Sequence, residues 1–250
     1  VTAVFVPRPF LALSNERGIL RRSAAQTVGV TARHLQTVEL RAQLLDDAQV
    51  LPLLVSSPTR KPAAAHDSDD SDDEPKLPAP RAQFVQRISL KPQGPTDWAS
   101  IAVDLSRLTS GASGAVLVEV AAVELVAARP GLTLPPPVRG LYRLTDLGPI
   151  LTASRPRSLL SVHRLADGAP VAAAQISRYL PGGSATLLGR TDAHGVLSLE
   201  TQEDRDLTHQ RALFVIESAA PPGGTRDRAY LAIPQDGRDR DDNSDGAQPA

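Results

Sequence analysis

The sequence contains no cysteine and no methionine, and each absence narrows what the chain can be. Without cysteine, disulfide cross-links, thiol catalysis, cysteine-ligated zinc and an internal thioester are excluded within these 250 residues. The absence does not fix the compartment, because a secreted protein can also lack cysteine. The chain begins with Val1, so we expect an internal fragment, with any signal peptide or lipid anchor outside it.

Aromatic side chains, net charge and long apolar runs are also scarce. Phe, Trp and Tyr make up 3% of the chain, so a core must be built from Val, Leu, Ile and Ala. Such a composition suits two modest cores better than one large core. The net charge is −1 and the basic residues are scattered singly, so we expect no nucleic-acid-binding face. The longest mostly apolar run, Val120–Ala128, contains Glu124 and is too short to span a bilayer, so we expect no membrane contact.

Proline and glycine are abundant, at 22 and 17 residues, which favours many short strands over long helices. Apolar residues alternate in Thr27–Arg33 and again in Val38–Leu44, and this period of two predicts antiparallel strands. The step between them, Arg33–Gln36, is short enough for a hairpin. A helix through Ala32–Ala48 is the alternative, because its residues are good helix formers. Further strands are expected at Phe84–Leu90, Trp98–Leu108, Ala115–Val126 and Arg139–Leu147.

An acidic insertion is expected at about 58–80. Within it, His66–Glu74 carries six acidic residues in nine positions, with no apolar side chain to anchor them. Like charges at this density repel one another, so we expect this loop to be disordered or highly mobile.

The C-terminal residues 235–250 form an Asp-rich tail or linker. Within it, Asp241, Asn243 and Asp245 occupy alternate positions before a glycine, which matches the first half of a calcium-binding loop. The bidentate glutamate of such a loop would fall beyond Ala250. A solvated acidic tail is therefore the favoured interpretation, with these three residues as a weak metal candidate.

Two turn motifs stand out in the second half of the chain. Gly168 and Pro170 belong to the first motif, and Asp192 and Gly195 belong to the second, Thr-Asp-Ala-His-Gly. An aspartate can accept hydrogen bonds from the backbone after it, and glycine adopts the positive φ that ends such a turn. Seven strands at regular spacing predict a sandwich; they are expected at Ile150–Ala153, Leu159–Leu165, Ala174–Leu180, Thr186–Arg190, Gly195–Glu200, Ala212–Glu217 and Arg228–Ile233.

The second half resembles the macroglobulin-like domains of bacterial alpha-2-macroglobulins. The resemblance rests on Tyr-Arg-Leu-Thr-Asp-Leu-Gly at 142–148, on the two turn motifs, and on the late strand at 228–231. Residues 1–130 are similar, less specifically, to the preceding domain of that kind through Trp98-x-x-Ile101-x-Val103-Asp104-Leu105. The same turn pattern also occurs in transthyretin-like and carboxypeptidase-regulatory-like modules.

This resemblance implies an all-β fold of two tandem antiparallel β-sandwiches, immunoglobulin-like or macroglobulin-like. The domains would cover residues 1–145 and 146–234. The resemblance further implies a structural scaffold within a broad-spectrum protease trap, located in the periplasm or at the cell surface. Its partners would be neighbouring domains of the same polypeptide, with target proteases bound by the whole molecule. The thioester of the family requires a cysteine, so these residues cannot carry it.

Two residues depart from the expected pattern. Arg178 lies where the inward register of Ala174 and Ile176 calls for an apolar side chain, so we expect it at a sandwich rim or displaced by a bulge. Pro149 follows a step where the family continues as a strand, and proline cannot donate a ladder hydrogen bond.

No motif indicates catalysis. Ser161 and His163 are two apart on one expected strand, with no third group to complete a nucleophilic site. The five histidines show no metal-ligand spacing, and neither glycine-rich step has the lysine of a phosphate loop. We therefore expect a non-enzyme without a cofactor. The alternative to the protease-trap scaffold is a transthyretin-like or immunoglobulin-like binding or adhesion module of a bacterial surface protein.

Overall fold

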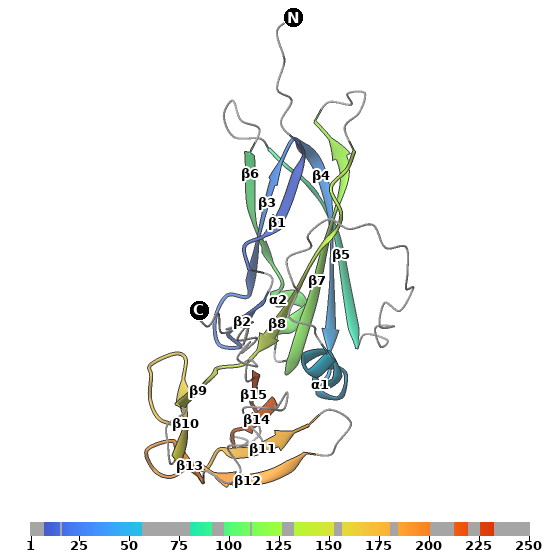
Figure 1. The fold of residues 1–250 in the computed structure, drawn as a ribbon. Helices are drawn as coiled ribbons and strands as arrows, with labels where there is room; N and C mark the ends of the chain where they lie inside the picture. Colours follow the sequence, from blue (N-terminus) through green and yellow to red (C-terminus); the bar gives the residue numbers. More distant parts are fainter. Residues whose placement is uncertain are drawn as a thin grey trace, which may run out of the picture.

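The computed structural model describes residues 8–15, 17–56, 81–91, 98–110, 112–126, 133–152, 157–180, 185–200, 213–219 and 226–232. Its two helices in these ranges have ten and four residues, and strands form nearly all the remaining regular structure. The predicted all-β class is confirmed. The strands form four sheets, which pack as two sandwiches (Figure 1). The expected insertion at 58–80 and the expected tail at 235–250 lie outside the described residues.

The first sandwich packs a three-stranded sheet against a five-stranded sheet. The strand β2 (Arg17–Leu20) runs parallel to β8 (Val138–Leu144), whereas the other pairings in this sandwich are antiparallel. The smaller sheet has the order β1-β3-β6 and the larger one β2-β8-β7-β4-β5. The remaining strands are β1 (Phe10–Leu13), β3 (Thr27–Arg33), β4 (Leu35–Leu45), β5 (Ala82–Ser89), β6 (Trp98–Asp104) and β7 (Gly114–Leu125).

The two alternating segments at 27–44 form strands, but the predicted hairpin between them is wrong. β3 pairs with β1 and β6, whereas β4 pairs with β5 and β7, so the chain crosses from one sheet to the other between them. The crossing occurs at His34, which has a φ of +56°. The apolar positions of β3 and β4 therefore face each other across the core, where Val30 and Leu40 are both buried.

Two helices were not predicted from the sequence. The helix α1 (Asp47–Ser56) begins directly after β4 with a reciprocal cap. Asp46 Oδ1 accepts the N–H of Gln49 at 3.0 Å, and Gln49 Oε1 accepts the N–H of Asp46 at 2.9 Å. This is a capping box, which satisfies amide groups that the first turn leaves without helical partners. The short helix α2 (Ser106–Thr109) ends the strand predicted over Trp98–Leu108 earlier than expected.

The second sandwich has the seven predicted strands among its described residues. Three of them form a sheet of order β13-β10-β9, and four form a sheet of order β12-β11-β14-β15. The strands are β9 (Leu147–Thr152), β10 (Arg157–Arg164), β11 (Gln175–Tyr179), β12 (Thr186–Arg190), β13 (Val196–Glu200), β14 (Leu213–Glu217) and β15 (Arg228–Ala232). Between these sheets lies a core that includes Leu160, Val162, Ile176 and Phe214, all fully buried.

The two departures noted in the sequence have local explanations. Pro149 lies in β9, an edge strand, where a missing amide donor breaks no ladder on the open side. Arg178 lies on the inward face beside Ile176, half-buried and opposite Phe214 of β14. A bulge is present at this point, but the extra residue is Leu188 of β12. The register of β11 against β14 is continuous, so the bulge does not turn Arg178 outward.

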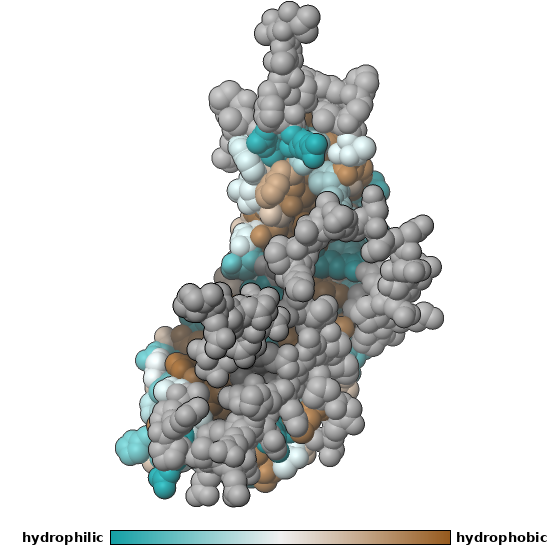
Figure 2. Space-filling view, in the orientation of Figure 1, coloured by the Kyte–Doolittle hydropathy of each residue, from teal (hydrophilic) through white to brown (hydrophobic). Residues whose placement is uncertain are grey.

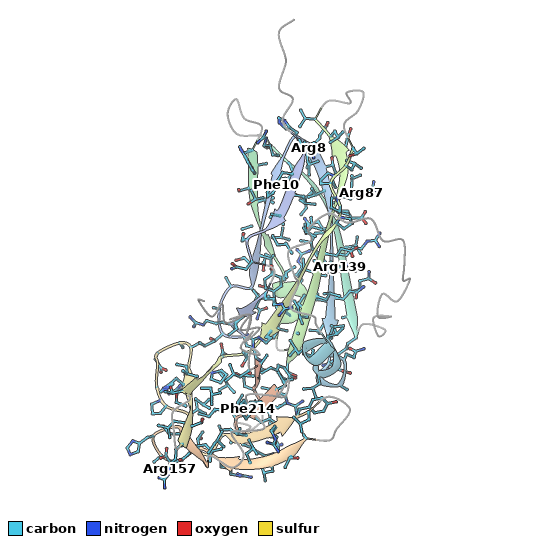
Figure 3. The ribbon with its side chains drawn as sticks, viewed as in Figure 1. Arg8, Phe10, Arg87, Arg139, Arg157 and Phe214 are labelled. Carbon is cyan, nitrogen blue, oxygen red and sulfur yellow. The ribbon has the colours of Figure 1, made fainter. Side chains whose placement is uncertain are left out.

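An aromatic cluster lies on the outer face of the three-stranded sheet of the first sandwich. Phe10 and Trp98 meet edge to face at 5.5 Å, and the guanidinium of Arg33 lies 5.5 Å from the centre of the Trp98 ring. Phe10 is 43% exposed and lies at the end of this sandwich that is far from the second one (Figure 3). Figure 2 shows apolar surface in the same place.

Candidate functional site at the junction of the sandwiches

The strand β14, in the four-stranded sheet of the second sandwich, is buried on both faces. Successive residues of a strand point to opposite faces of its sheet, and in β14 four successive residues are buried. Phe214 (labelled in Figure 3) and Ile216 belong to the core of the second sandwich, whereas Leu213 and Val215 point toward the first. The first sandwich therefore covers the outer face of β14 and of the adjacent β15.

An apolar cluster, here called the junction cluster, joins the two sandwiches. Its members come from the lower end of the first sandwich, from α1, and from the outer face of β14 and β15, which lie close together in Figure 1. Burying apolar side chains is the largest favourable term in such a contact, at roughly 25 cal/mol per Å². The buried members are Leu45, Val50, Ala115, Leu213, Val215 and Tyr230, and the half-buried members are Leu51, Leu53, Leu54, Leu117, Leu141 and Tyr179.

A polar network lies beside the junction cluster and is centred on Asp227. Asp227 Oδ2 accepts the N–H of Asp146 at 2.7 Å, in the short segment between the sandwiches. The guanidinium of Arg22, from the first sandwich, lies 3.6 Å from Asp227 Oδ1. Burial raises the pKa of Asp227, and the Asp146 amide, the Thr145 hydroxyl and Arg22 each oppose that rise. One carboxylate of the second sandwich thus contacts both the connecting segment and the first sandwich.

Two further contacts fix the connecting segment and β8. Asp146 Oδ1 accepts the N–H and the hydroxyl of Ser23, at 3.1 and 2.8 Å. Arg143 donates to the carbonyl of Tyr230 in β15. Burial, together with the nearby charge of Arg17, lowers the pKa of Arg143. The junction therefore combines apolar packing with hydrogen bonds made from both sides.

The two turn motifs lie away from the junction, where they fix the second sandwich. Asp192 Oδ1 accepts the N–H groups of His194 and Val196, both at 2.9 Å. These bonds, that of Val196 foremost, lower the pKa of Asp192. Because the folded-state pKa lies below its unfolded value, the stability that Asp192 contributes is lost as the pH falls through that lowered pKa.

The two motifs meet at the end of β10. Gly195 has a φ of +73°, and its carbonyl accepts the N–H of Val162 at 2.8 Å. The carbonyl of Val162 in turn accepts the N–H of Val171 at 2.9 Å. Pro170 lies against Gly195, while Gly168, with a φ of +71°, occupies an open turn. These four predicted residues are thus turn and packing residues in the structure.

Thr191 ties the motifs together, and its hydroxyl can be tested directly. The hydroxyl accepts the N–H of Ala174 at 2.9 Å and donates to the carbonyl of Val171 at 2.7 Å, in a buried position. Thr191→Val keeps the shape but leaves both backbone groups unpaired, so we expect about 1–3 kcal/mol less stability in urea unfolding. Thr191→Ser keeps the hydroxyl and is the matched control. Equal losses in the two variants would contradict this role.

The metal and catalytic candidates considered in the sequence form no site among the described residues. Asp241, Asn243 and Asp245 lie outside the described residues. In the described part of the chain, no three His, Asp or Glu side chains gather as metal ligands. Ser161 and His163 lie two apart on β10, and His163 pairs with Pro170 rather than with a catalytic partner. No helix among the described residues is long and apolar enough to cross a membrane.

Sequence reasoning missed the junction, although two signals were present. The run Leu-Phe-Val-Ile at 213–216 has no polar alternation, which is typical of a strand that is buried on both faces. The capping pair Asp46 and Gln49 precedes the apolar stretch of α1. Asp227 and Arg22 carry no sequence signal, because they meet only through the fold.

Comparisons with known proteins identify the fold. No protein-family model and no curated protein matches the sequence. A solved fragment of native Escherichia coli alpha-2-macroglobulin spanning domains NIE-MG1 is 17% identical, with a TM-score of 0.59 over 90% of this chain and 97% of the fragment. A longer fragment of the same protein, MG0-NIE-MG1, is 15% identical with a TM-score of 0.59 over 90% of this chain. The chain spans 64% of that longer fragment. These likenesses establish a macroglobulin-like fold.

Proposed function

We propose that this chain is a structural scaffold of a bacterial alpha-2-macroglobulin-like protease trap. Its proposed role is mechanical rather than catalytic. The chain holds neighbouring domains in fixed positions. The observation that carries the proposal is the junction, in which the outer face of β14 and β15 is buried against the first sandwich. A strand that is buried on both faces, one of them against the other sandwich, suits a unit that transmits force better than two modules on a free linker would, because inter-domain motion is the default without an apolar interface.

The fold likeness supports the same proposal and refines it. The share of the E. coli fragment that is covered falls from 97% for NIE-MG1 to 64% for MG0-NIE-MG1, while the share of this chain stays at 90%. We therefore assign the first sandwich as the counterpart of NIE and the second as the counterpart of MG1. The proposed location is the periplasm or the cell surface. The proposed partners are neighbouring domains of the same polypeptide, and proteases bound by the whole molecule.

The full-length product of the gene that encodes this chain provides the test. A protease that is enclosed but not chemically blocked should lose activity toward a large protein substrate and keep it toward a small peptide substrate. We expect this split after incubation with trypsin or elastase, and no inhibition by the two-sandwich chain alone. Equal activity toward both substrates, at an excess of the full-length protein, would contradict the trap. Saturable binding of the chain alone to a cell-surface component would then favour the adhesion module.

A further inference from the structure

The junction contains a buried carboxylate whose two oxygens have different surroundings. Asp227 Oδ2 accepts the N–H of Asp146 at 2.7 Å, and the hydroxyl of Thr145 also bonds this carboxylate. Asp227 Oδ1 is buried and accepts no hydrogen bond from the described residues. Its nearest charge is Arg22, at 3.6 Å, which is beyond hydrogen-bond distance. The residue is only 8% exposed, so water does little to replace the missing donors.

The charges around Asp227 do not fully compensate for its burial. Arg22 faces it from the first sandwich, and a second carboxylate, Asp146, faces it from the connecting segment. Directly after Asp227, Arg228 pairs with Glu217 of β14, and directly before it the carbonyl of Arg226 accepts a hydrogen bond from Arg22. A buried carboxylate that forms an ion pair without a hydrogen bond to Oδ1, and that has a like charge nearby, is shifted toward its neutral form.

We propose that Asp227 makes the junction sensitive to pH: when its buried carboxyl group takes up a proton, the closed arrangement of the two sandwiches is favoured. The inference rests on the proposed scaffold function, for which it supplies a regulation. The proton, taken from solvent, goes to Oδ1, and Oδ2 keeps its donors from the connecting segment. The step gives up the ion pair with Arg22 and removes the cost of a buried charge.

The direction follows from linkage. Burial in the closed junction raises the pKa of Asp227, whereas in an open junction the carboxyl group meets water. A group with a higher pKa in one state favours that state when protonated, so this contribution is fully present below the open-state pKa. It is lost as the pH rises through the closed-state pKa. This dependence is opposite to that of Asp192, which contributes less as the pH falls.

The absence of cysteine makes the experiment clean. Ala102 in β6 and Ser198 in β13 are exposed and belong to different sandwiches, so cysteines placed there would be the only labelling sites. Single-molecule energy transfer between two dyes then reports the closed and open populations of the whole chain. We expect the closed-to-open ratio to rise severalfold as the pH falls from neutral through the raised closed-state pKa of Asp227. Asp227→Asn, neutral and isosteric, should be as closed at neutral pH as the parent is in acid, without a pH response.

Two further measurements keep the test decisive. Arg22→Gln removes the opposing cation, so it should lower the ratio at neutral pH and enlarge the acid response. The difference in unfolding free energy between the parent and Asp227→Asn isolates Asp227 from the other carboxylates, and it should favour the parent more as the pH falls. A pH-independent difference, or an acid response unchanged in Asp227→Asn, would overturn the proposal. A single closed population at every pH, together with a pH-independent difference in unfolding free energy, would overturn the pH proposal but would be consistent with the proposed scaffold function. A broad population under all conditions would contradict the scaffold itself.

Discussion

Replacing Gly195 with alanine is expected to destabilise the second sandwich far more than replacing Gly168, although the two glycines have nearly the same backbone conformation. Their φ angles are +73° and +71°, so an added Cβ meets the same conformational penalty at both positions, roughly 1–2 kcal/mol. Their surroundings differ. A Cβ on Gly195 would lie 2.7 Å from the carbonyl oxygen of Val162, whereas one on Gly168 would meet nothing within 4 Å.

The contacts at Gly195 leave little room for relaxation. The same Cβ would lie 3.0 Å from the Pro170 Cβ and 3.0 Å from the Val171 nitrogen, so backbone atoms surround it on two sides. The carbonyls of Val162 and Gly195 are themselves hydrogen-bonded, so a shift of either strand would lengthen those bonds. We therefore expect Gly195→Ala to cost on the order of 3–5 kcal/mol, with the penalty of Gly168→Ala close to the conformational term alone.

Calorimetry of the two variants gives the measurement. For a domain of about this size, 1 kcal/mol corresponds to roughly 4–8 °C in melting temperature. Gly168→Ala should lower the transition of the second sandwich by about that amount, and Gly195→Ala by at least about twice as much. Similar shifts in both variants would mean that φ strain alone governs the turn and that the packing against Pro170 adds nothing.

The second sandwich could be predicted from local features. Its strands begin and end within three residues of the positions predicted from alternation and turn residues. The prediction succeeded because Asp192 and Gly195 define a turn by their own chemistry, through short-range bonds to the following backbone. Turns of this kind restrict the ends of the adjacent strands, so little long-range information is needed.

Which strands pair in the first sandwich could not be predicted in the same way. An alternating pattern shows which residues of β3 and β4 face a core, but both sheets of a sandwich face the same core. The short step between these strands suits a hairpin and a crossing equally well, and only the strand pairings in the structure distinguish them. The pairing partners, β6 and β5, lie far along the chain, where alternation carries no information about them.

The junction required tertiary information for another reason. Val215 and Ile216 are similar side chains, and the sequence alone does not say what lies on each side of their strand. The apolar run indicates burial on both faces, but not that α1 and the end of the first sandwich provide the second cover. The same limit applies to Asp227, whose partners are Arg22 and the amide of Asp146.

Adjacent substitutions in β14 should separate the stability of the second sandwich from that of the junction. Val215→Asp places a charge in the junction cluster, and Ile216→Asp places the same charge in the core of the second sandwich. Both residues are buried and both pair with β11 and β15, so strand position and pairing are matched. An unpaired buried charge costs several kcal/mol, so the protein favours a conformation in which water reaches the charge.

The conformational change that exposes the new charge differs between the two variants. The charge at Val215 reaches water when the sandwiches part, so we expect both to stay folded, with a retained β circular dichroism signal and a junction that is open. Calorimetry should then show two separate transitions, each without the stabilisation that the junction adds. The charge at Ile216 reaches water only when the second sandwich unfolds, so that variant should lose the transition of the second sandwich and keep that of the first. Loss of the second sandwich in Val215→Asp as well would show that β14 cannot stay folded without its outer cover. In that case the two sandwiches would form one cooperative unit rather than two folded parts joined by a rigid contact.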